Sequence, residues 1–237
     1  MTRTLWPRLV QLVLVLALPV CLLVADLRIA TGHWFVRWEY GKANFPPDPY
    51  GLSTAERIRL ATVCVDYLAT NAPLSLLADL RLPGGEPAFN ARELRHMADV
   101  QAVYSRISMA GVVAALVLLV GIVVLLAAGH ARRRVPAVLL RGSLLTLGLL
   151  GAVGAYMALR WDTFFTQFHQ LFFEGDTWTF PYSDTLIRLF PMQFWIDVAV
   201  VIVSLLLVAI LVAGAVGWIW TRRGGRFGTR MHADKHG

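Results

Sequence analysis

The chain has 237 residues, of which 57% are hydrophobic and only 16% are charged, whereas soluble domains carry about 25% charged residues. Its mean hydropathy is +0.60. This composition excludes an ordinary water-soluble domain. The formal net charge of +7 is also found in nucleic-acid-binding proteins, so the positions of the charges decide its meaning.

Four apolar segments are long enough to cross a hydrocarbon layer about 30 Å thick, which takes about 20 helical residues. With their flanks, we expect them to cover residues 9–28, 109–129, 140–160 and 196–220. Charged residues are absent from the apolar centres of these segments. We therefore expect an all-α membrane protein with four transmembrane helices, organised as a single membrane domain over residues 1–237.

Lys and Arg are divided unequally between the two sides of this arrangement. The N-terminus, residues 130–141 and the tail 221–237 hold eleven of them against one acidic residue, whereas the other connections hold eleven against fourteen. Because cytoplasmic loops carry the excess of Lys and Arg, we expect both termini in the cytoplasm. The positive charge thus follows the membrane topology, and no nucleic-acid partner is predicted.

Residues 29–108 are then an extracytoplasmic segment between the first two spans, and its pattern is helical. Ser53 and Glu56 have the spacing of a capping box at the start of one helix. A Pro-Gly-Gly turn follows at residues 83–85. Asn90 is placed to cap a further helix that continues into the second span.

The connection between the third and fourth spans, residues 161–195, contains twelve aromatic residues. An aromatic belt at the membrane surface is the simplest explanation. The number of aromatic residues exceeds what anchoring the chain at the membrane surface requires. We therefore expect an aromatic interfacial lip, formed by a half-helix or a re-entrant segment.

Several kinds of chemistry lack support in the sequence. The two cysteines, Cys21 and Cys64, fall in the first span and in the outer segment, so we predict no disulfide. No P-loop, GxGxxG, HExxH or GxSxG motif is present. The spans hold few polar residues, which argues against a transporter.

His96 is the first candidate catalytic residue, in the sequence Glu93-Leu-Arg-His96-Met-Ala-Asp99. At about 100° per residue, the three polar side chains share one broad face of a helix. Glu93 or Asp99 is then placed to orient the imidazole and to raise its basicity. The alternative interpretation is a solvated, charged helix face.

His169 is the second candidate, and it lies beside a helical stripe formed by Trp161, Phe165, Phe168 and Phe172. Asp176 and Trp178 follow it along the chain. This pattern puts a titratable imidazole next to an apolar surface at the membrane boundary, where a lipid ester is able to rest. We expect the stripe and Trp178 to bind substrate and Asp176 to support the histidine. The alternative is an interfacial histidine without a chemical role.

A metal site is not predicted. His96, His169 and nearby carboxylates have the donor types of a zinc site, but a third histidine at ligand spacing is missing. His33 would supply it only if the chain folded back. Cys64 and the outer serines have no neighbouring base in sequence, so covalent catalysis is not favoured either.

Four motifs, in this order and between these spans, give the chain a resemblance to a known family. They are Tyr40 through Gly51-Leu52-Ser53 with Glu56-Arg57; Phe89-Asn90-Ala-Arg-Glu93-Leu-Arg-His96-Met-Ala-Asp99-Val100; Phe165-x-x-Phe168-His169-x-Leu171-Phe172-Phe173 followed by Trp178; and Asp184-Thr-Leu-Ile-x-Leu189-Phe190-Pro191-x-x-Phe194-Trp195. Over nearly its whole length the chain resembles the bacterial lipoprotein intramolecular transacylase family. The basic tail after residue 220 lies outside the motifs.

The resemblance implies an enzyme of the bacterial cytoplasmic membrane that acts at its extracytoplasmic face on diacylglyceryl-modified lipoproteins. It implies transfer of the sn-2 acyl chain to the α-amine of the cysteine, giving the lyso form. The functional histidines of the family map onto His96 and His169. No cofactor is then required, because acid–base catalysis by histidine serves an amine and an ester that belong to one molecule. Membrane lipid is the other expected partner, and the oligomeric state is not indicated.

A non-catalytic protein that binds lipid or a partner in the cell envelope is the alternative from another class. It predicts that both histidines are dispensable. Membership of a fold family does not by itself establish the reaction.

Overall fold

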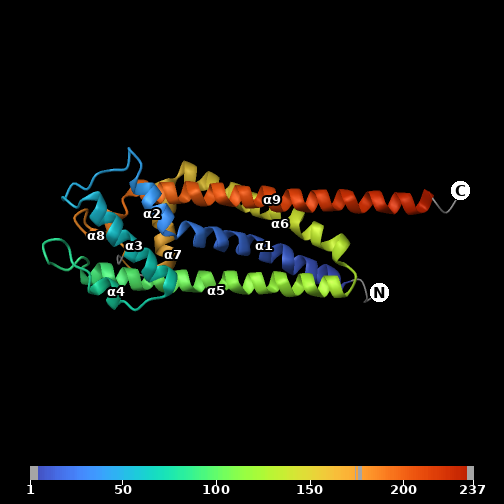
Figure 1. The fold of residues 1–237 in the computed structure, drawn as a ribbon, viewed down its shortest axis with the longest axis horizontal. Helices are drawn as coiled ribbons and strands as arrows, with labels where there is room; N and C mark the ends of the chain where they lie inside the picture. The colour runs from blue at the N-terminus through green and yellow to red at the C-terminus, as the bar shows by residue number, and fades with distance from the viewer. Residues whose placement is uncertain (1–4, 174, 176–177, 234–237) are drawn as a thin grey trace. The chain divides into compact units, whose positions relative to one another are not determined.

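The structure is a computed structural model that describes residues 5–173, 175 and 178–233. This part of the chain is almost entirely helical (Figure 1). Its helices, in chain order, are α1 (Trp6–Ala30), α2 (His33–Tyr40), α3 (Thr54–Thr70), α4 (Ser75–Ala78), α5 (Ala91–Ala127), α6 (Ala131–Leu159), α7 (Trp161–Phe172), α8 (Thr185–Leu189) and α9 (Met192–Ala233).

Four of these helices are long and apolar enough to cross a membrane: α1, α5, α6 and α9 over Met192–Arg222. This confirms the prediction of an all-α protein with four membrane helices. Their most apolar stretches have mean hydropathies between 1.7 and 3.1. The connection between α5 and α6 is tighter than expected, because residues 131–141 form the first turns of α6 and the turn itself lies at Gly129, with φ +72°.

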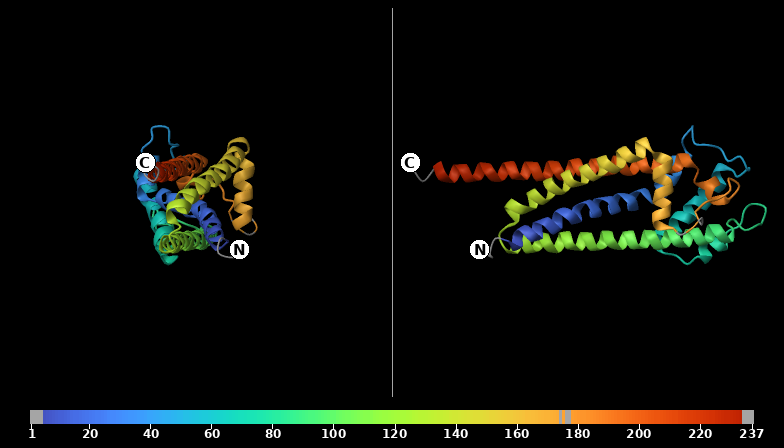
Figure 2. Two further views of the ribbon diagram at one scale, coloured as in Figure 1. Left: turned by 90° about the vertical axis from the view of Figure 1, so that its right-hand side faces the viewer. Right: turned by 180° about the vertical axis from the view of Figure 1, so that it is seen from behind.

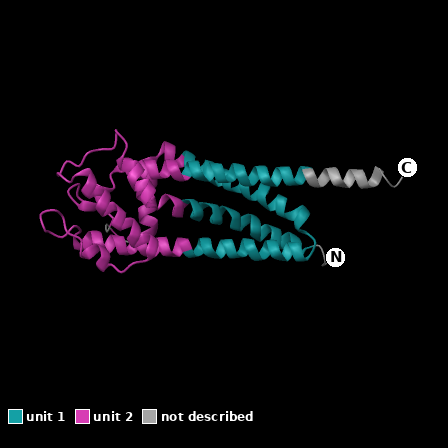
Figure 3. Ribbon diagram, in the orientation of Figure 1, with its two compact units in different colours: residues 1–26, 109–155, 203–237 teal, residues 27–108, 156–202 magenta. Residues whose placement is uncertain are grey.

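The chain divides into two compact units, coloured separately in Figure 3. Unit 1 consists of residues 1–26, 109–155 and 203–237, and unit 2 of residues 27–108 and 156–202. Unit 1 therefore holds most of the apolar helix length. Unit 2 holds the short helices and both candidate histidines.

Unit 1 is held together by small apolar contacts between helices. Leu14, Leu125 and Val138 are at most 1% exposed and belong to its core cluster. A Cβ atom on Gly217 would lie 2.8 Å from the carbonyl oxygen of Pro136, so only glycine allows α9 to approach α6 this closely. Such close approach is typical of membrane helices, which associate through packing rather than through the hydrophobic effect.

Unit 2 packs the apolar face of α3 against α4, α8 and the start of α5. Leu60, Leu77 and Leu189 are fully buried in this core, together with the free thiol of Cys64. Ser53 caps α3 as predicted, because its hydroxyl accepts the N–H of Glu56. The capping box is only half formed, since the Glu56 carboxylate pairs with Arg59 instead.

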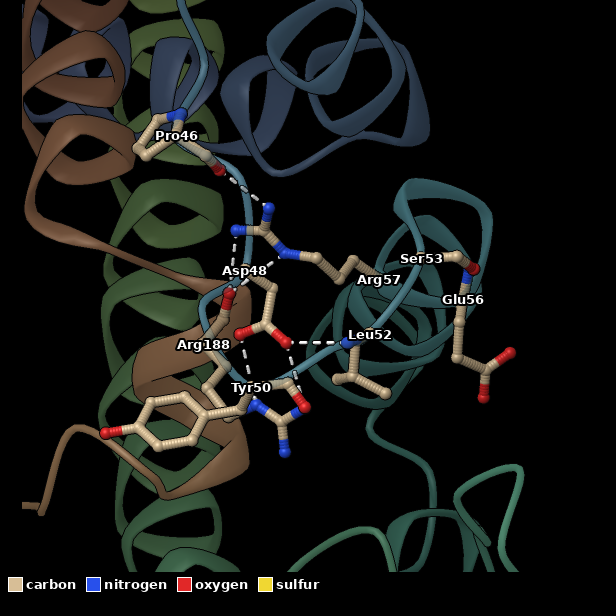
Figure 4. Close-up of polar contacts among 8 residues, drawn as sticks. All are labelled: Pro46, Asp48, Tyr50, Leu52, Ser53, Glu56, Arg57 and Arg188. Atoms are coloured by element: carbon tan, nitrogen blue, oxygen red, sulfur yellow. Dashed lines mark hydrogen bonds and ion pairs between the residues drawn. The ribbon is translucent and has the colours of Figure 1, made fainter.

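A buried arginine joins the loop before α3 to α8 (Figure 4). Arg57 is 3% exposed. It donates to the carbonyl oxygen of Pro46 at 2.8 Å and to that of Arg188 at 2.7 and 3.0 Å. Arg188 in turn binds the carboxylate of Asp48 through two of its nitrogens. Hydrogen bonds from all three guanidinium nitrogens offset part of the cost of burying this charge, and they fix α8 beside the loop.

Candidate active site

Both candidate histidines lie in unit 2, on helices that run in different directions. His96 is in the first half of α5, and His169 is near the end of α7, which runs in a direction transverse to α5 (Figures 1 and 2). Residues 91–108 of α5 carry five charged side chains and precede its apolar stretch. His96 therefore lies outside the membrane-spanning part of α5.

The start of α5 is built by a reciprocal cap. The side chain of Asn90 accepts the N–H groups of Arg92 and Glu93, and the Glu93 carboxylate accepts the N–H of Asn90 at 2.8 Å. Each of these bonds satisfies a backbone group that has no partner within the helix. The expected cap at Asn90 is thus confirmed, and it places His96 in the second turn.

Glu93 does not orient His96, contrary to the sequence interpretation. Its carboxylate is 1% exposed, and its second oxygen accepts the N–H of Leu186 in α8 at 2.7 Å. Burial raises the pKa of Glu93, while these two backbone donors oppose the rise. Its role is to join the start of α5 to α8. Asp99 makes no hydrogen bond or ion pair with any described residue, so it does not orient His96 either.

The hydrogen bond of His169 fixes the proton of its imidazole. Its Nδ1 lies 2.7 Å from the carbonyl oxygen of Phe165, one turn earlier. A carbonyl only accepts, so Nδ1 carries the proton. Burial lowers the pKa of His169, and the bond to Phe165 opposes this. In the neutral ring, Nε2 is left with a free lone pair.

The imidazole rings of His96 and His169 are nearly parallel. Their planes differ by 20°, and their centroids are 6.4 Å apart. Phe173 and Phe180 pack on His96 at 4.8 and 5.3 Å. Burial, and then the nearby His169, lower the pKa of His96 to about 4. Its Nδ1 is buried and has no hydrogen-bond partner among the described residues. Both histidines are therefore neutral at pH 7.

Trp178 supplies a second unpaired polar group. Its ring centroid lies 4.9 Å from that of His169, and its buried Nε1–H has no partner in the part of the chain that the structure describes. A buried donor without an acceptor is costly and is uncommon outside sites that bind a ligand. The arrangement offers one N–H donor and one basic nitrogen to an incoming group.

The remaining predicted residues are placed as follows. Phe165 packs on His169 at 4.2 Å, and Phe168 packs on both His169 and Phe172. Phe168 and Phe172 are 43% and 38% exposed, which leaves an apolar surface beside the histidine. Trp161 donates to the sulfur of Met192. Asp176 lies outside the described residues.

One residue of the site had no clear signal in the sequence. Phe180 lies 84 positions from His96, in a segment without helical or strand periodicity.

His33 was considered above as a third metal ligand. It pairs instead with Asp66 at 2.7 Å. Within the described residues, no group of three His, Cys, Asp or Glu side chains is arranged to hold a metal ion.

Four membrane-crossing helices and a pair of neutral, enclosed histidines define a multi-pass membrane protein with the groups for acid–base chemistry. A family model described as "Lipoprotein intramolecular transacylase Lit" matches residues 12–195, which include both histidines. The chain belongs to this family, and it is therefore a membrane-integral acyltransferase.

Individual relatives share the sequence or the fold of this chain. An uncharacterized protein of Aquifex aeolicus is 32% identical over 190 residues, which cover 80% of this chain and 84% of the relative. The solved structure of the lipoprotein intramolecular transacylase Lit of Bacillus cereus has a TM-score of 0.77 at 21% identity, covering 93% of this chain and 98% of that chain. A variant of that protein with a histidine-to-arginine mutation has a TM-score of 0.74 at 20% identity, covering 94% of this chain and 96% of that chain. The fold is thus shared over nearly the whole length.

Replacing Glu93 with alanine removes two acceptors and leaves the N–H groups of Asn90 and Leu186 unpaired. At about 1–3 kcal/mol for the buried N–H of Leu186 and about 1 kcal/mol for the part-buried N–H of Asn90, we expect the free energy of unfolding in detergent to fall by about 2–4 kcal/mol. Glu93→Gln keeps one acceptor and is expected to lose about half as much. Glu86 is exposed, so Glu86→Ala is the control and should change stability by less than about 0.5 kcal/mol. Equal stability of Glu93→Ala and the parent would contradict the assigned role.

Proposed function

We propose that this chain moves the sn-2 acyl chain of a diacylglyceryl-modified lipoprotein to the α-amine of its N-terminal cysteine, with His96 and His169 as the catalytic residues. In this reaction the amine nitrogen bonds to the ester carbonyl carbon, the ester C–O bond breaks, and the amine proton passes to the departing glycerol oxygen. The observation that supports the proposal best is the 6.4 Å separation of two half-buried imidazoles from different helices.

His169 is the proposed general base. With its Nδ1 proton committed to the carbonyl oxygen of Phe165, its Nε2 is the atom available to take a proton from the amine. Neutral imidazole is suited to this step because it gains a proton and then returns it within the same site. The proton returns to the glycerol oxygen as the ester bond breaks.

Trp178 and His96 are proposed to act on the ester carbonyl. The negative charge that develops on the carbonyl oxygen needs a fixed donor in a water-poor site. Trp178 offers such a donor next to His169, and the unpaired Nδ1 of His96 is a second group of the same enclosure. The exposed faces of Phe168 and Phe172 are then suited to hold the acyl chains.

The distribution of Lys and Arg supports an extracytoplasmic site. The connections that carry His96 and His169 hold fourteen acidic residues, and the opposite side holds one. Both termini are therefore proposed to be cytoplasmic. The site would then face the compartment in which lipoproteins carry a free N-terminal amine.

His96→Ala and His169→Ala are each expected to lower the rate of acyl transfer by about 100-fold or more, because each removes a group that handles the proton or the carbonyl. The measurement is mass spectrometry of the N-terminal lipopeptide of a reporter lipoprotein, in cells without other N-acylating enzymes. The parent should give N-acyl monoacylglyceryl product at unchanged total mass. His33→Ala is the matched control and should retain the parent rate. Parent-like conversion by both site variants would contradict the role of the histidines, whereas a folded parent that leaves the amine free would favour the non-catalytic, lipid-binding alternative.

The pH profile tests the charge state of the histidines. A base must be unprotonated, so its activity is present above its pKa and is lost as the pH falls through it. Burial lowers both pKa values from the ordinary 6.5. We therefore expect the acid limb of the transfer rate to have its midpoint below pH 6.5, measured with purified protein in mixed micelles. A midpoint at or above 6.5 would mean that the histidines are solvated or paired with a carboxylate.

Trp178→Phe keeps the ring and removes only the N–H donor. Loss of one donor to the oxyanion is expected to lower kcat by about 100-fold, with a much smaller effect on KM. Trp220→Phe is the control, since Trp220 is exposed on α9, and it should leave kcat unchanged. An unaltered kcat in Trp178→Phe would remove this tryptophan from the mechanism.

A further inference from the structure

Unit 1 contains a half-open cavity of about 650 Å³ that has no part in the proposed reaction. Its lining comes from the first turns of α1 and α6: Arg8, Gln11, Leu12, Val15, Arg133, Arg134, Ala137 and Arg141. Four of these eight residues are arginines. They come from two helices that are more than 100 positions apart in sequence, so the fold brings the charges together.

The four arginines have no acidic partner among the described residues. Asp26 is the one acidic residue among the described residues of unit 1. It lies 18 positions after Arg8 on α1, about 27 Å along a helix. Arg134 donates to the side chain of Gln11 at 2.8 Å, and no ion pair is formed by any of the four within the described chain. Like charges gathered in this way repel one another unless an anion joins them.

The walls of the cavity indicate what kind of anion fits. Leu12, Val15 and Ala137 give it an apolar side, and Leu12 is 54% exposed on the surface of α1, next to Leu9 and Leu16 at 62% and 56%. An occupant therefore meets guanidinium groups at one end and a lipid-facing helix surface at the other. Arginine binds phosphate oxygens through two parallel N–H donors.

We propose that this cavity binds the phosphate headgroup of an anionic membrane phospholipid, with its acyl chains along the apolar surface of α1. Basic pockets between membrane helices on the cytoplasmic side are suited to such headgroups. The excess of Lys and Arg at the N-terminus and in residues 130–141 puts the cavity on the proposed cytoplasmic side. The lipid is a ligand of the fold and not the acyl donor, so the proposal does not rest on the transfer reaction.

A requirement for cytoplasmic positive charge explains the presence of these arginines but not their convergence. Topology depends on the number of Lys and Arg near the helix ends. It does not require that four of them line one cavity, nor that Gln11, a polar residue that is 7% exposed in a membrane helix, joins them. The test must therefore compare arginines inside and outside the cavity at equal charge.

The experiment measures lipid binding to the purified full-length chain by native mass spectrometry and by thermal unfolding in detergent. Phosphatidylglycerol is titrated against phosphatidylcholine and inorganic phosphate. Arg133→Gln/Arg141→Gln removes two charges from the cavity, and Arg132→Gln/Arg222→Gln removes two from the same side outside it. Arg133→Lys/Arg141→Lys keeps the positive charge that sets the membrane topology. This variant therefore still tests lipid binding if the Gln variant fails to fold.

We expect phosphatidylglycerol to bind the parent and raise its Tm, and the affinity to fall about 30-fold in the cavity Gln variant. The Lys variant should lose several-fold, and the control variant less than twofold. Equal losses in the cavity and control variants would reduce the effect to surface charge and overturn the proposal. The same Tm shift from inorganic phosphate alone would make the site one for free phosphate. No preference for phosphatidylglycerol over phosphatidylcholine would also overturn it.

Discussion

The two hydrogen bonds of the Glu93 carboxylate are the constraint on which unit 2 depends. One closes the cap of α5 and the other holds the first turn of α8. His96 follows one turn later on the same helix, so its position is set by that cap. Phe173 and Phe180, both between α7 and α8 in the sequence, pack on the imidazole. An ion pair between Arg92 and Asp184 reinforces the same junction at 2.8 Å, and Arg57 and Arg188 hold α8 from its other end.

Within the described part of the chain, the surroundings of the histidines are aromatic, and no carboxylate contacts either ring. An acid–base site commonly pairs histidine with an acidic residue, which raises the basicity of the imidazole. Here Glu93, three residues before His96, is used for structure, and burial makes both rings weaker bases. The proposed chemistry compensates by proximity, because the amine and the ester arrive in one molecule. Under such conditions the enzyme needs a neutral base in the correct place more than a strong one.

The sequence was sufficient for the membrane helices and the helix caps. A bilayer imposes a minimum length on any span, so four apolar stretches of about 20 residues predict four helices directly. Asn90 and Ser53 were predictable because a cap involves residues only two or three positions apart. The same local reasoning predicted that Glu93 orients His96. This prediction was wrong because the carboxylate binds the N–H of Leu186, which is 93 positions away in the sequence. The contact of Phe180 with His96 was out of reach for the same reason, as was the direction of the pKa shifts, which burial by distant segments decides.

The distribution of the thiols has a consequence for how the protein is made. Unit 2 contains one cysteine, Cys64, which is fully buried in its core, and Cys21 belongs to α1 in unit 1. A single thiol cannot form a cross-link within its own unit. The stability of unit 2 therefore comes from non-covalent contacts, among them its buried arginine, its shared carboxylate and its apolar core. Its folding requires neither an oxidising compartment nor a disulfide isomerase, so reducing conditions during synthesis or purification leave its native contacts intact.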